Sequence, residues 1–184
     1  MVKIKWRITD DIRNISLKEF NTEVHWIYGY FELDVNDKTV GHCPDKESFP
    51  VVLSCFEEDI TDWLYQLPNM ILQLNDCDEY EWNLLDMNLL KMVIKKEDTL
   101  LISLIHSRAG ILWSERVTYQ EYITALLCAI DRFVEEIRTL NSELLNSNTL
   151  CRIMEIRDML SRSSLLDLQI SEIIKGIGDI LIFT

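Results

Sequence analysis

The sequence predicts an α+β protein in which an antiparallel sheet of about five to seven strands packs against C-terminal helices. Three observations indicate this class. Short apolar runs with turn residues between them fill residues 1–117, helical periodicity dominates residues 118–178, and 48% of the 184 residues are hydrophobic. That apolar content is enough for a buried core, so residues 1–184 are expected to fold as a single domain.

The first elements of the chain are predicted strands. Residues 2–8 alternate apolar and charged side chains, which is the period of a half-buried strand. The aromatic run at 25–33 predicts a second strand, and polar residues at 36–38 predict a turn after it. Residues 49–55 predict a further short strand, and Pro50 places it at a sheet edge because proline lacks an amide donor.

One helix is predicted inside the strand-rich part, near residues 56–74. Ser54 and Glu57 have the spacing of a capping box, which satisfies free amides at a helix N-terminus, so the helix is expected to begin there. Pro68 is expected to break or kink it. Apolar residues at helical spacing mark its buried face: Phe56, Ile60, Trp63, Leu64 and Leu67.

The pattern then changes to four short strand-like runs within residues 79–117. Their short polar connections favour an antiparallel meander. Thr118 and Glu121 form a second capping box, and the apolar residues that follow recur at helical spacing, which predicts a long helix. Two further helices are predicted around 150–160 and 166–177.

The negative charge of the chain is concentrated in one segment. The formal net charge is −13, and residues 47–90 contain ten acidic residues but no lysine or arginine. Acids and bases nearly balance elsewhere, so this excess creates a local field that attracts a basic protein surface. The same charge argues against nucleic acid and acidic membranes as partners, because phosphate binding needs a cationic footprint.

No catalytic or metal-binding motif accompanies this charge. The sequence contains no GxxxxGK[ST], GxSxG or HExxH, and an acidic run at 76–81 lacks the glycine and spacing of a calcium loop. Four residues have side chains that bind zinc but not the spacing of a known closed site: His42, Cys43, Cys55 and Cys77. The sequence therefore predicts no enzyme activity, no metal and no cofactor.

The cysteines and the chain ends predict the compartment. The five cysteines are irregularly spaced and form no CxxC pair, which is typical of reduced thiols. The N-terminus has no continuous apolar stretch like that of a signal peptide, and charges interrupt the apolar C-terminal region well short of the ~18 residues of a membrane span. A cytoplasmic protein is expected.

The acidic segment supplies the candidate partner-binding residues. Its two groups, at 57–62 and 76–81, are expected to share one exposed face because both flank the predicted helix and its return connection. An aromatic ring among exposed acids can anchor an interface, although a core position is the commoner role of a tryptophan. The alternative is a solvated face without a partner. The expected contact residues are Glu57, Glu58, Asp59, Asp62, Asp78, Glu79, Tyr80, Glu81 and Trp82.

Two phrases of the sequence carry a family resemblance: EEDITDWL at 57–64 and VTYQEY at 117–122. Within a strand-rich half followed by hairpins and helices, they resemble the small, acidic bacterial immunity proteins that accompany polymorphic and contact-dependent-inhibition toxins. The resemblance implies a non-enzymatic inhibitor that binds a cognate toxin, often a basic nuclease, in the cytoplasm. Two other classes stay open: an adaptor or regulatory subunit that binds another protein through its C-terminal helices, and an enzyme of unrecognised type.

Overall fold

The structure, a computed structural model, describes residues 1–43, 58–84 and 89–162. Its strands are β1 (Val2–Ile8), β2 (Tyr28–Val35), β3 (Lys38–His42), β4 (Glu58–Asp59), β5 (Glu79–Asn83), β6 (Leu90–Lys96), β7 (Leu100–His106) and β8 (Gly110–Val117). Its helices are α1 (Leu17–Glu19), α2 (Ile60–Gln73), α3 (Tyr119–Asn141) and a helix over 148–162. Short helical turns lie at Ile12–Asn14, Phe20–Val24 and Ser142–Asn146.

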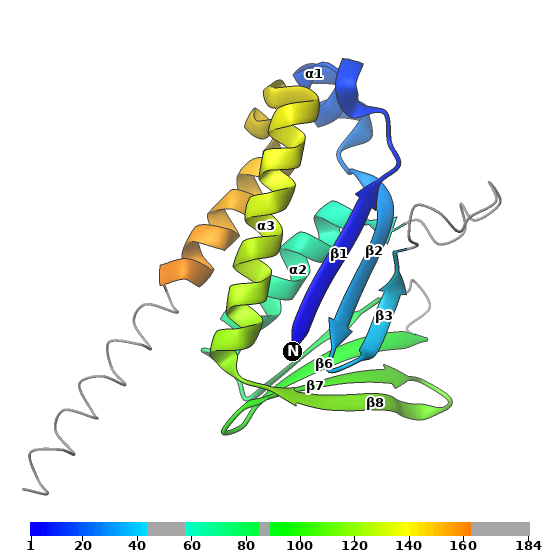
Figure 1. Ribbon diagram of the computed structural model, residues 1–184, viewed down its shortest axis with the longest axis vertical. Helices are drawn as coiled ribbons and strands as arrows, with labels where there is room; N and C mark the ends of the chain where they lie inside the picture. The colour runs from blue at the N-terminus through cyan, green and yellow to red at the C-terminus, as the bar shows by residue number, and fades with distance from the viewer. Residues whose placement is uncertain (44–57, 85–88, 163–184) are drawn as a thin grey trace, which may run out of the picture.

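The α+β prediction is confirmed, since antiparallel strands and helices make up the described chain (Figure 1). The strands form two four-stranded sheets, however, and not one sheet of five to seven strands. The first sheet has the order β1-β2-β3, with β4 also paired to β2, and the second is the meander β5-β6-β7-β8. α2 lies between the two sets of strands in the sequence. It contacts β2 of the first sheet and β5 of the second, so it connects the two sheets.

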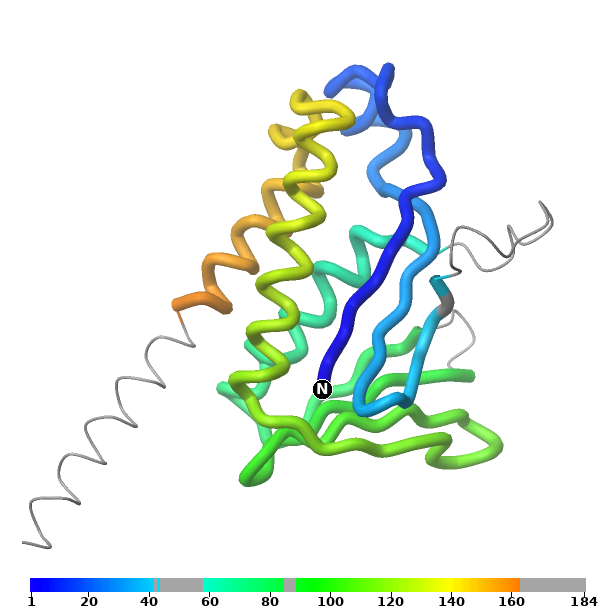
Figure 2. Tube along the Cα trace, in the orientation of Figure 1, coloured from blue at the N-terminus to red at the C-terminus, as the bar shows by residue number. Residues whose placement is uncertain are grey.

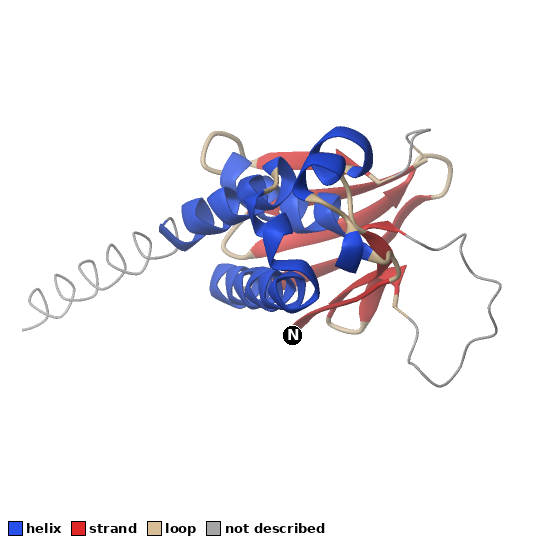
Figure 3. Cartoon of the chain, turned by 90° about the horizontal axis from the view of Figure 1, so that it is seen from above, coloured by secondary structure: helices blue, strands red, loops and turns tan. Residues whose placement is uncertain are grey.

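The helices gather on one side of the molecule and the strands on the other (Figure 3). The start of β1 lies next to the start of α3 (Figure 2), where the Met1 amino group is 2.8 Å from the Glu121 carboxylate. The helix over 148–162 runs back beside α3 and confirms the helix predicted around 150–160. No helix of the described ranges combines the length and the apolar character that crossing a membrane requires.

The tight turn between β2 and β3 confirms the predicted turn and holds the second sheet. Asn36 and Asp37 both have positive φ, 52° and 66°, which suits a two-residue hairpin and which these two residue types tolerate. The Asn36 side-chain amide donates to the Arg116 carbonyl of β8 at 3.0 Å. In return, the Trp113 indole of β8 donates to the Thr39 carbonyl at 3.2 Å.

α2 begins at Ile60, so the predicted helix start near 56 is wrong. Asp59 is the N-cap, and its carboxylate accepts the Asp62 amide at 3.1 Å. The capping box predicted at Ser54 and Glu57 lies outside the described residues. The helix continues through its internal proline, so that residue does not end it.

The two residues before α2 form β4 because pairing with β2 extends the backbone there. Glu58 pairs with Gly29, which has no side chain to hold the strands apart. A Cβ at Gly29 would lie 2.1 Å from the Arg7 carbonyl oxygen and 2.7 Å from Ile60 Cδ1. The glycine therefore allows the N-terminus of α2 to lie directly against the first sheet.

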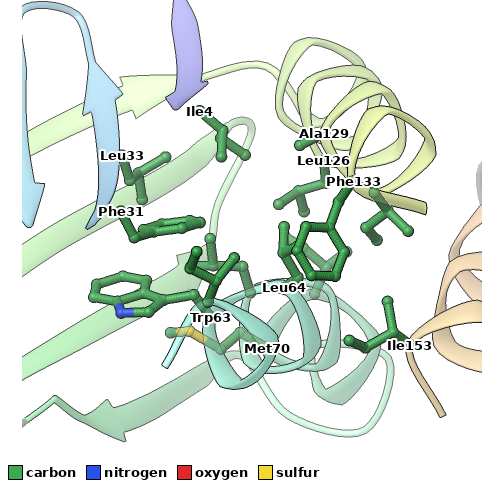
Figure 4. Packing of buried hydrophobic residues seen from close by; sticks show 14 of the residues in the cluster. Ile4, Phe31, Leu33, Trp63, Leu64, Met70, Leu126, Ala129, Phe133 and Ile153 are labelled. Atoms are coloured by element: carbon green, nitrogen blue, oxygen red, sulfur yellow. The ribbon is translucent and has the colours of Figure 1, made fainter. Parts of the chain in front are cut away.

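The buried face of α2 fills the space between the first sheet and α3 (Figure 4). The Trp63 ring stacks on Phe31 of β2 with 4.7 Å between ring centroids. Leu64 and Leu67 are fully buried, as the apolar spacing predicted. One hydrophobic cluster contains these side chains together with Phe133 of α3 and buried residues of both sheets.

The remaining local predictions have mixed outcomes. β1 and the meander are confirmed, and the Thr118 hydroxyl caps α3 by accepting a backbone amide at 3.2 Å. β2 begins at Tyr28, later than predicted, because His25 has a left-handed φ of 63° and ends the preceding helical turn. β3 was not predicted. The strand expected at 49–55 and the helix expected at 166–177 lie outside the described residues.

Candidate functional site

The structure divides the predicted acidic site into two groups with different surroundings. Glu58, Asp59 and Asp62, here called the α2 carboxylates, lie at the N-terminus of α2. Glu79 and Glu81, here called the β5 carboxylates, lie on β5. The exposed Asp78 follows the C-terminus of α2, whose 14 residues span about 21 Å, and Glu57 lies outside the described residues. Glu79 and Glu81 lie on the face of β5 away from Tyr80 and Trp82, which pack against the core, and the shared acidic face stays a prediction.

The aromatic residues of β5 face the core. Tyr80 and Trp82 are half-buried and pack against the hydrophobic cluster, while the residues that alternate with them are exposed. The Trp82 ring meets Trp63 of α2 edge-on, with 4.8 Å between ring centroids. Neither aromatic residue stands among the large exposed hydrophobic side chains of the described chain. Packing against α2 therefore explains both without a partner.

The β5 carboxylates already have cations beside them. Lys95 of β6 places its Nζ 3.9 Å from the Glu79 carboxylate, and the Lys91 Nζ donates to Glu81. These lysines come from the neighbouring strand of the same sheet. Exposed pairs of this kind contribute little stability, but they neutralise the charge that the sequence suggested was free.

The α2 carboxylates have no such partners. All three are half-buried, and no lysine or arginine within the described ranges lies at ion-pair distance from any of them. Desolvation by burial is the largest influence on each and raises the pKa of each carboxyl above its ordinary value. Side-chain hydrogen bonds oppose that shift, with Trp63 as donor to Glu58, Thr61 to Asp59 and Gln66 to Asp62.

Two exposed aromatic side chains stand beside the α2 carboxylates. Trp26 is 43% exposed and Tyr28 is 42% exposed. Tyr28 pairs with Asp59 across β2 and β4, and its amide donates to the Asp10 carboxylate at 2.7 Å. Burial, followed by the negative charges of Asp59 and Asp10, raises the pKa of the Tyr28 phenol, which therefore stays a hydrogen-bond donor.

The loop that carries Trp26 is held from both sides. The Thr149 hydroxyl, on the helix over 148–162, donates to the His25 carbonyl at 2.7 Å. The Ile60 amide, at the start of α2, donates to the Ile27 carbonyl at 3.0 Å. These bonds fix Trp26 at the junction of the two helices. We call this region the α2 N-terminal surface, and it comprises Asp10, Trp26, Tyr28, Glu58, Asp59 and Asp62.

A cavity of about 240 Å³ opens in this surface between α2 and the helix over 148–162. Its lining combines rings, one carboxylate and one guanidinium, and consists of Trp26, Thr61, Asp62, Tyr65, Gln66, Thr149, Arg152 and Ile153. The guanidinium carbon of Arg152 lies 4.6 Å from the centre of the Tyr65 ring, a cation–π contact. The positive charge of Arg152 also acts to lower the pKa of Asp62, against the larger effect of burial.

The carboxylates are not arranged as metal ligands. Among the described residues, no three His, Cys, Asp or Glu side chains come together in a way that could hold a metal ion. Of the cysteines considered for zinc, Cys43 is half-buried, Cys77 is exposed and Cys55 lies outside the described residues. The absence of a metal and of a cofactor stays a prediction.

Sequence reasoning missed the aromatic part of this surface and Arg152. The sequence did contain a signal for the two rings. In an extended segment, Trp26 and Tyr28 point to the face away from the buried Ile27 and Gly29. No local signal identified Arg152, because its contact with Tyr65 joins residues far apart in the sequence.

Comparisons of the chain with family models, with curated proteins and with solved structures find no match. The resemblance to immunity proteins therefore stays a prediction. Only the chemistry of the residues themselves bears on function.

Proposed function

We propose that this protein is a non-enzymatic inhibitor that binds a basic protein, a cognate toxin domain, on its α2 N-terminal surface. The observation that supports this proposal is the set of half-buried α2 carboxylates without a lysine or arginine partner among the described residues. Burying an uncompensated carboxylate costs stability, and a cation from a bound protein removes that cost. The surface is thus better suited to a complex than to the free chain.

The exposed rings supply the second requirement of a protein interface. Trp26 and Tyr28 lie beside the carboxylates, and aromatic residues are the commonest anchors of tight interfaces. The wider negative charge of the chain, −13 in total, would attract the partner from a distance. The β5 carboxylates are expected to add little to this field or to the contact, because lysines already neutralise them.

A second candidate is an adaptor that binds a helix of another protein. A groove of about 180 Å³ between α2 and the helix over 148–162 favours it, and Met159 on its rim is 55% exposed. The groove shares Tyr65 and Arg152 with the cavity beside Trp26. An adaptor would lose binding on Met159→Asp, whereas an inhibitor that uses the α2 N-terminal surface would keep it.

The test begins with the gene next to the one that encodes this chain. If that gene encodes a secreted protein with a basic C-terminal domain, that domain is the partner to be measured. Binding kinetics and protection of growth are measured for the wild type and for two matched triple variants. One changes the α2 carboxylates (Glu58→Gln, Asp59→Asn, Asp62→Asn), and the other removes equal charge elsewhere (Asp78→Asn, Glu79→Gln, Glu81→Gln). The first should weaken binding by about 100-fold, since each charge-assisted contact contributes more than about 1 kcal/mol.

The second variant should weaken binding less than about threefold, through association rate alone. Equal losses in the two variants, both shown to be folded, would mean that general charge and not this surface holds the partner. A neighbouring gene of metabolic type, with no binding to a basic domain, would contradict the inhibitor proposal itself.

A further inference from the structure

The cavity beside Trp26 has three chemically different walls. The indole of Trp26 and the phenol ring of Tyr65 supply aromatic faces, Asp62 supplies a carboxylate, and Ile153 supplies a buried apolar side chain. An aromatic ring next to a partly desolvated carboxylate favours the binding of an organic cation. The face of the ring attracts positive charge, and the carboxylate forms a charge-assisted hydrogen bond with the cation.

Asp62 retains hydrogen-bonding capacity on this wall. Its Oδ1 accepts the Gln66 side-chain amide at 3.1 Å. Its Oδ2 receives no hydrogen bond from any residue of the described chain, and the nearby Arg152 lies beyond ion-pair distance from it. Burial raises the pKa of Asp62, so a cation that entered the cavity would meet a carboxylate that water solvates poorly.

The size of the cavity limits what can enter it. Its volume of about 240 Å³ is below the roughly 300–1,000 Å³ typical of sites for cofactors and drug-sized ligands. A single long side chain from a bound protein is a better match. Such a side chain would enter from the surface on which the partner is proposed to lie.

We propose that the cavity receives one arginine side chain of the basic partner, with its guanidinium between the Trp26 indole and the Asp62 carboxylate. This inference rests on the proposed function and names the group that the α2 N-terminal surface recognises. Arginine suits the site better than lysine because its planar guanidinium stacks on rings, binds carboxylates through two parallel hydrogen bonds and is weakly hydrated. The stacking of Arg152 on Tyr65 shows that this cavity accommodates a guanidinium on an aromatic face.

The positive charge of Arg152 does not exclude a second cation. The three α2 carboxylates outnumber the one guanidinium that lines the cavity, and the charge of Asp62 is felt at Asp59. The surface around the cavity therefore stays negative. An entering arginine would be drawn to Asp62 while Arg152 remains on Tyr65.

The test compares two peptides of equal charge, six arginines and six lysines, bound to the full chain at low salt. The hexa-arginine peptide should bind the wild type about fivefold more tightly than the hexa-lysine peptide. A preference of that size is in the range of one cation–π contact with the Trp26 ring. Trp26→Ala should remove that preference, and Trp26→Phe should retain part of it because a ring remains. Asp62→Asn should weaken hexa-arginine binding, whereas Asp98→Asn, the same change on the exposed β6–β7 turn, should leave it within about twofold.

The outcomes separate this inference from the proposed function. Equal binding of the two peptides, unaffected by Trp26→Ala but abolished when all three α2 carboxylates become amides, would overturn the arginine site and leave the acidic surface in place. Failure of both peptides to bind the folded wild type would contradict the site and the proposed function together. An arginine preference that survives Trp26→Ala would also overturn the inference, because the preference would arise elsewhere.

Discussion

The α2 carboxylates and the β5 carboxylates come from one acidic stretch of sequence, yet their surroundings are opposite. At the start of α2 the acids are half-buried, bonded to side chains of their own helix and without a cation among the described residues. On β5 the acids are exposed, and each faces a lysine of β6. Charge density along a sequence therefore identifies neither a free charge nor a binding surface. The neighbours that the fold supplies decide both.

Secondary structure explains the difference. A strand pairs with the next strand at a spacing that brings side chains of one face together. Lys95 on β6 therefore lies directly opposite Glu79, and Lys91 reaches Glu81 from the diagonal position. A helix N-terminus offers free amides to carboxylates and no cation. β4 pairs with β2, which holds Glu58 and Asp59 beside the first sheet, where both are half-buried.

Replacing Trp63, which contacts both β5 and the start of α2, should have the largest effect on the free energy of unfolding. Trp63 stacks on Phe31, meets Trp82 of β5 and donates a hydrogen bond to Glu58. Trp63→Ala should lower the free energy of unfolding, measured in urea, by about 3–5 kcal/mol, because a large core side chain is removed. Trp63→Phe keeps a ring and should lower it less. A loss below about 1 kcal/mol for the alanine variant would show that Trp63 does not connect the regions.

The capping role of Asp59 provides the next largest effect. Asp59→Ala removes the acceptor of the Asp62 amide and should cost about 0.5–2 kcal/mol of stability. Asp59→Asn is the control, since an amide oxygen caps a helix about as well as a carboxylate. Thermal unfolding of both variants would check this. If the asparagine variant were as unstable as the alanine variant, the charge and not the cap would be the stabilising feature.

Replacing Asp62 should raise the free energy of unfolding, whereas replacing Asp59 lowers it, and this gain should appear only above acidic pH. Burial raises its pKa in the folded chain, so the folded state binds the proton more tightly than the unfolded state does. The ionised group thus costs stability once the pH rises through the unfolded and then the folded pKa. Asp62→Asn should therefore stabilise the protein at pH 7, by no more than about 0.5 kcal/mol because solvent screens a half-exposed group.

Urea unfolding at several pH values would check this expectation. The wild type and Asp62→Asn should converge as the pH falls to about 3, where the carboxyl is protonated in both states. Lower stability of Asp62→Asn at pH 7 would mean that the ionised group stabilises the free chain, which would remove the contrast with β5.

The smallest effect is expected on β5. Glu81→Gln breaks the exposed pair with Lys91 and should change the free energy of unfolding by less than about 0.5 kcal/mol. High salt should abolish even that difference, because it screens exposed charges. A double-mutant cycle with Lys91→Met, measured at low and high salt, would check this. A coupling energy above about 1 kcal/mol between Glu81 and Lys91 would contradict this prediction, because the pair would then stabilise the second sheet substantially.

The elements with strong local periodicity were predictable from the sequence. β1, the meander and the buried face of α2 were predicted because alternation or helical spacing repeats over several residues. The start of α2 was not, since Ser54 with Glu57 and Asp59 with Asp62 both have capping spacing, and a long-range pairing selects the second. The aromatic and cationic parts of the candidate site depend on such pairings too. Tyr28 meets Asp59, and Arg152 meets Tyr65, only in the folded chain.

The cavity beside Trp26 draws its lining from residue 26, from 61–66 and from 149–153. Closing such widely separated segments is the slow part of folding, because loop entropy is lost before the contacts form. A chain that has not yet docked its helix over 148–162 therefore has no cavity. A partner that binds there selects the completed fold and stabilises it by mass action. Its concentration would then set how long each chain escapes proteolysis in the cell.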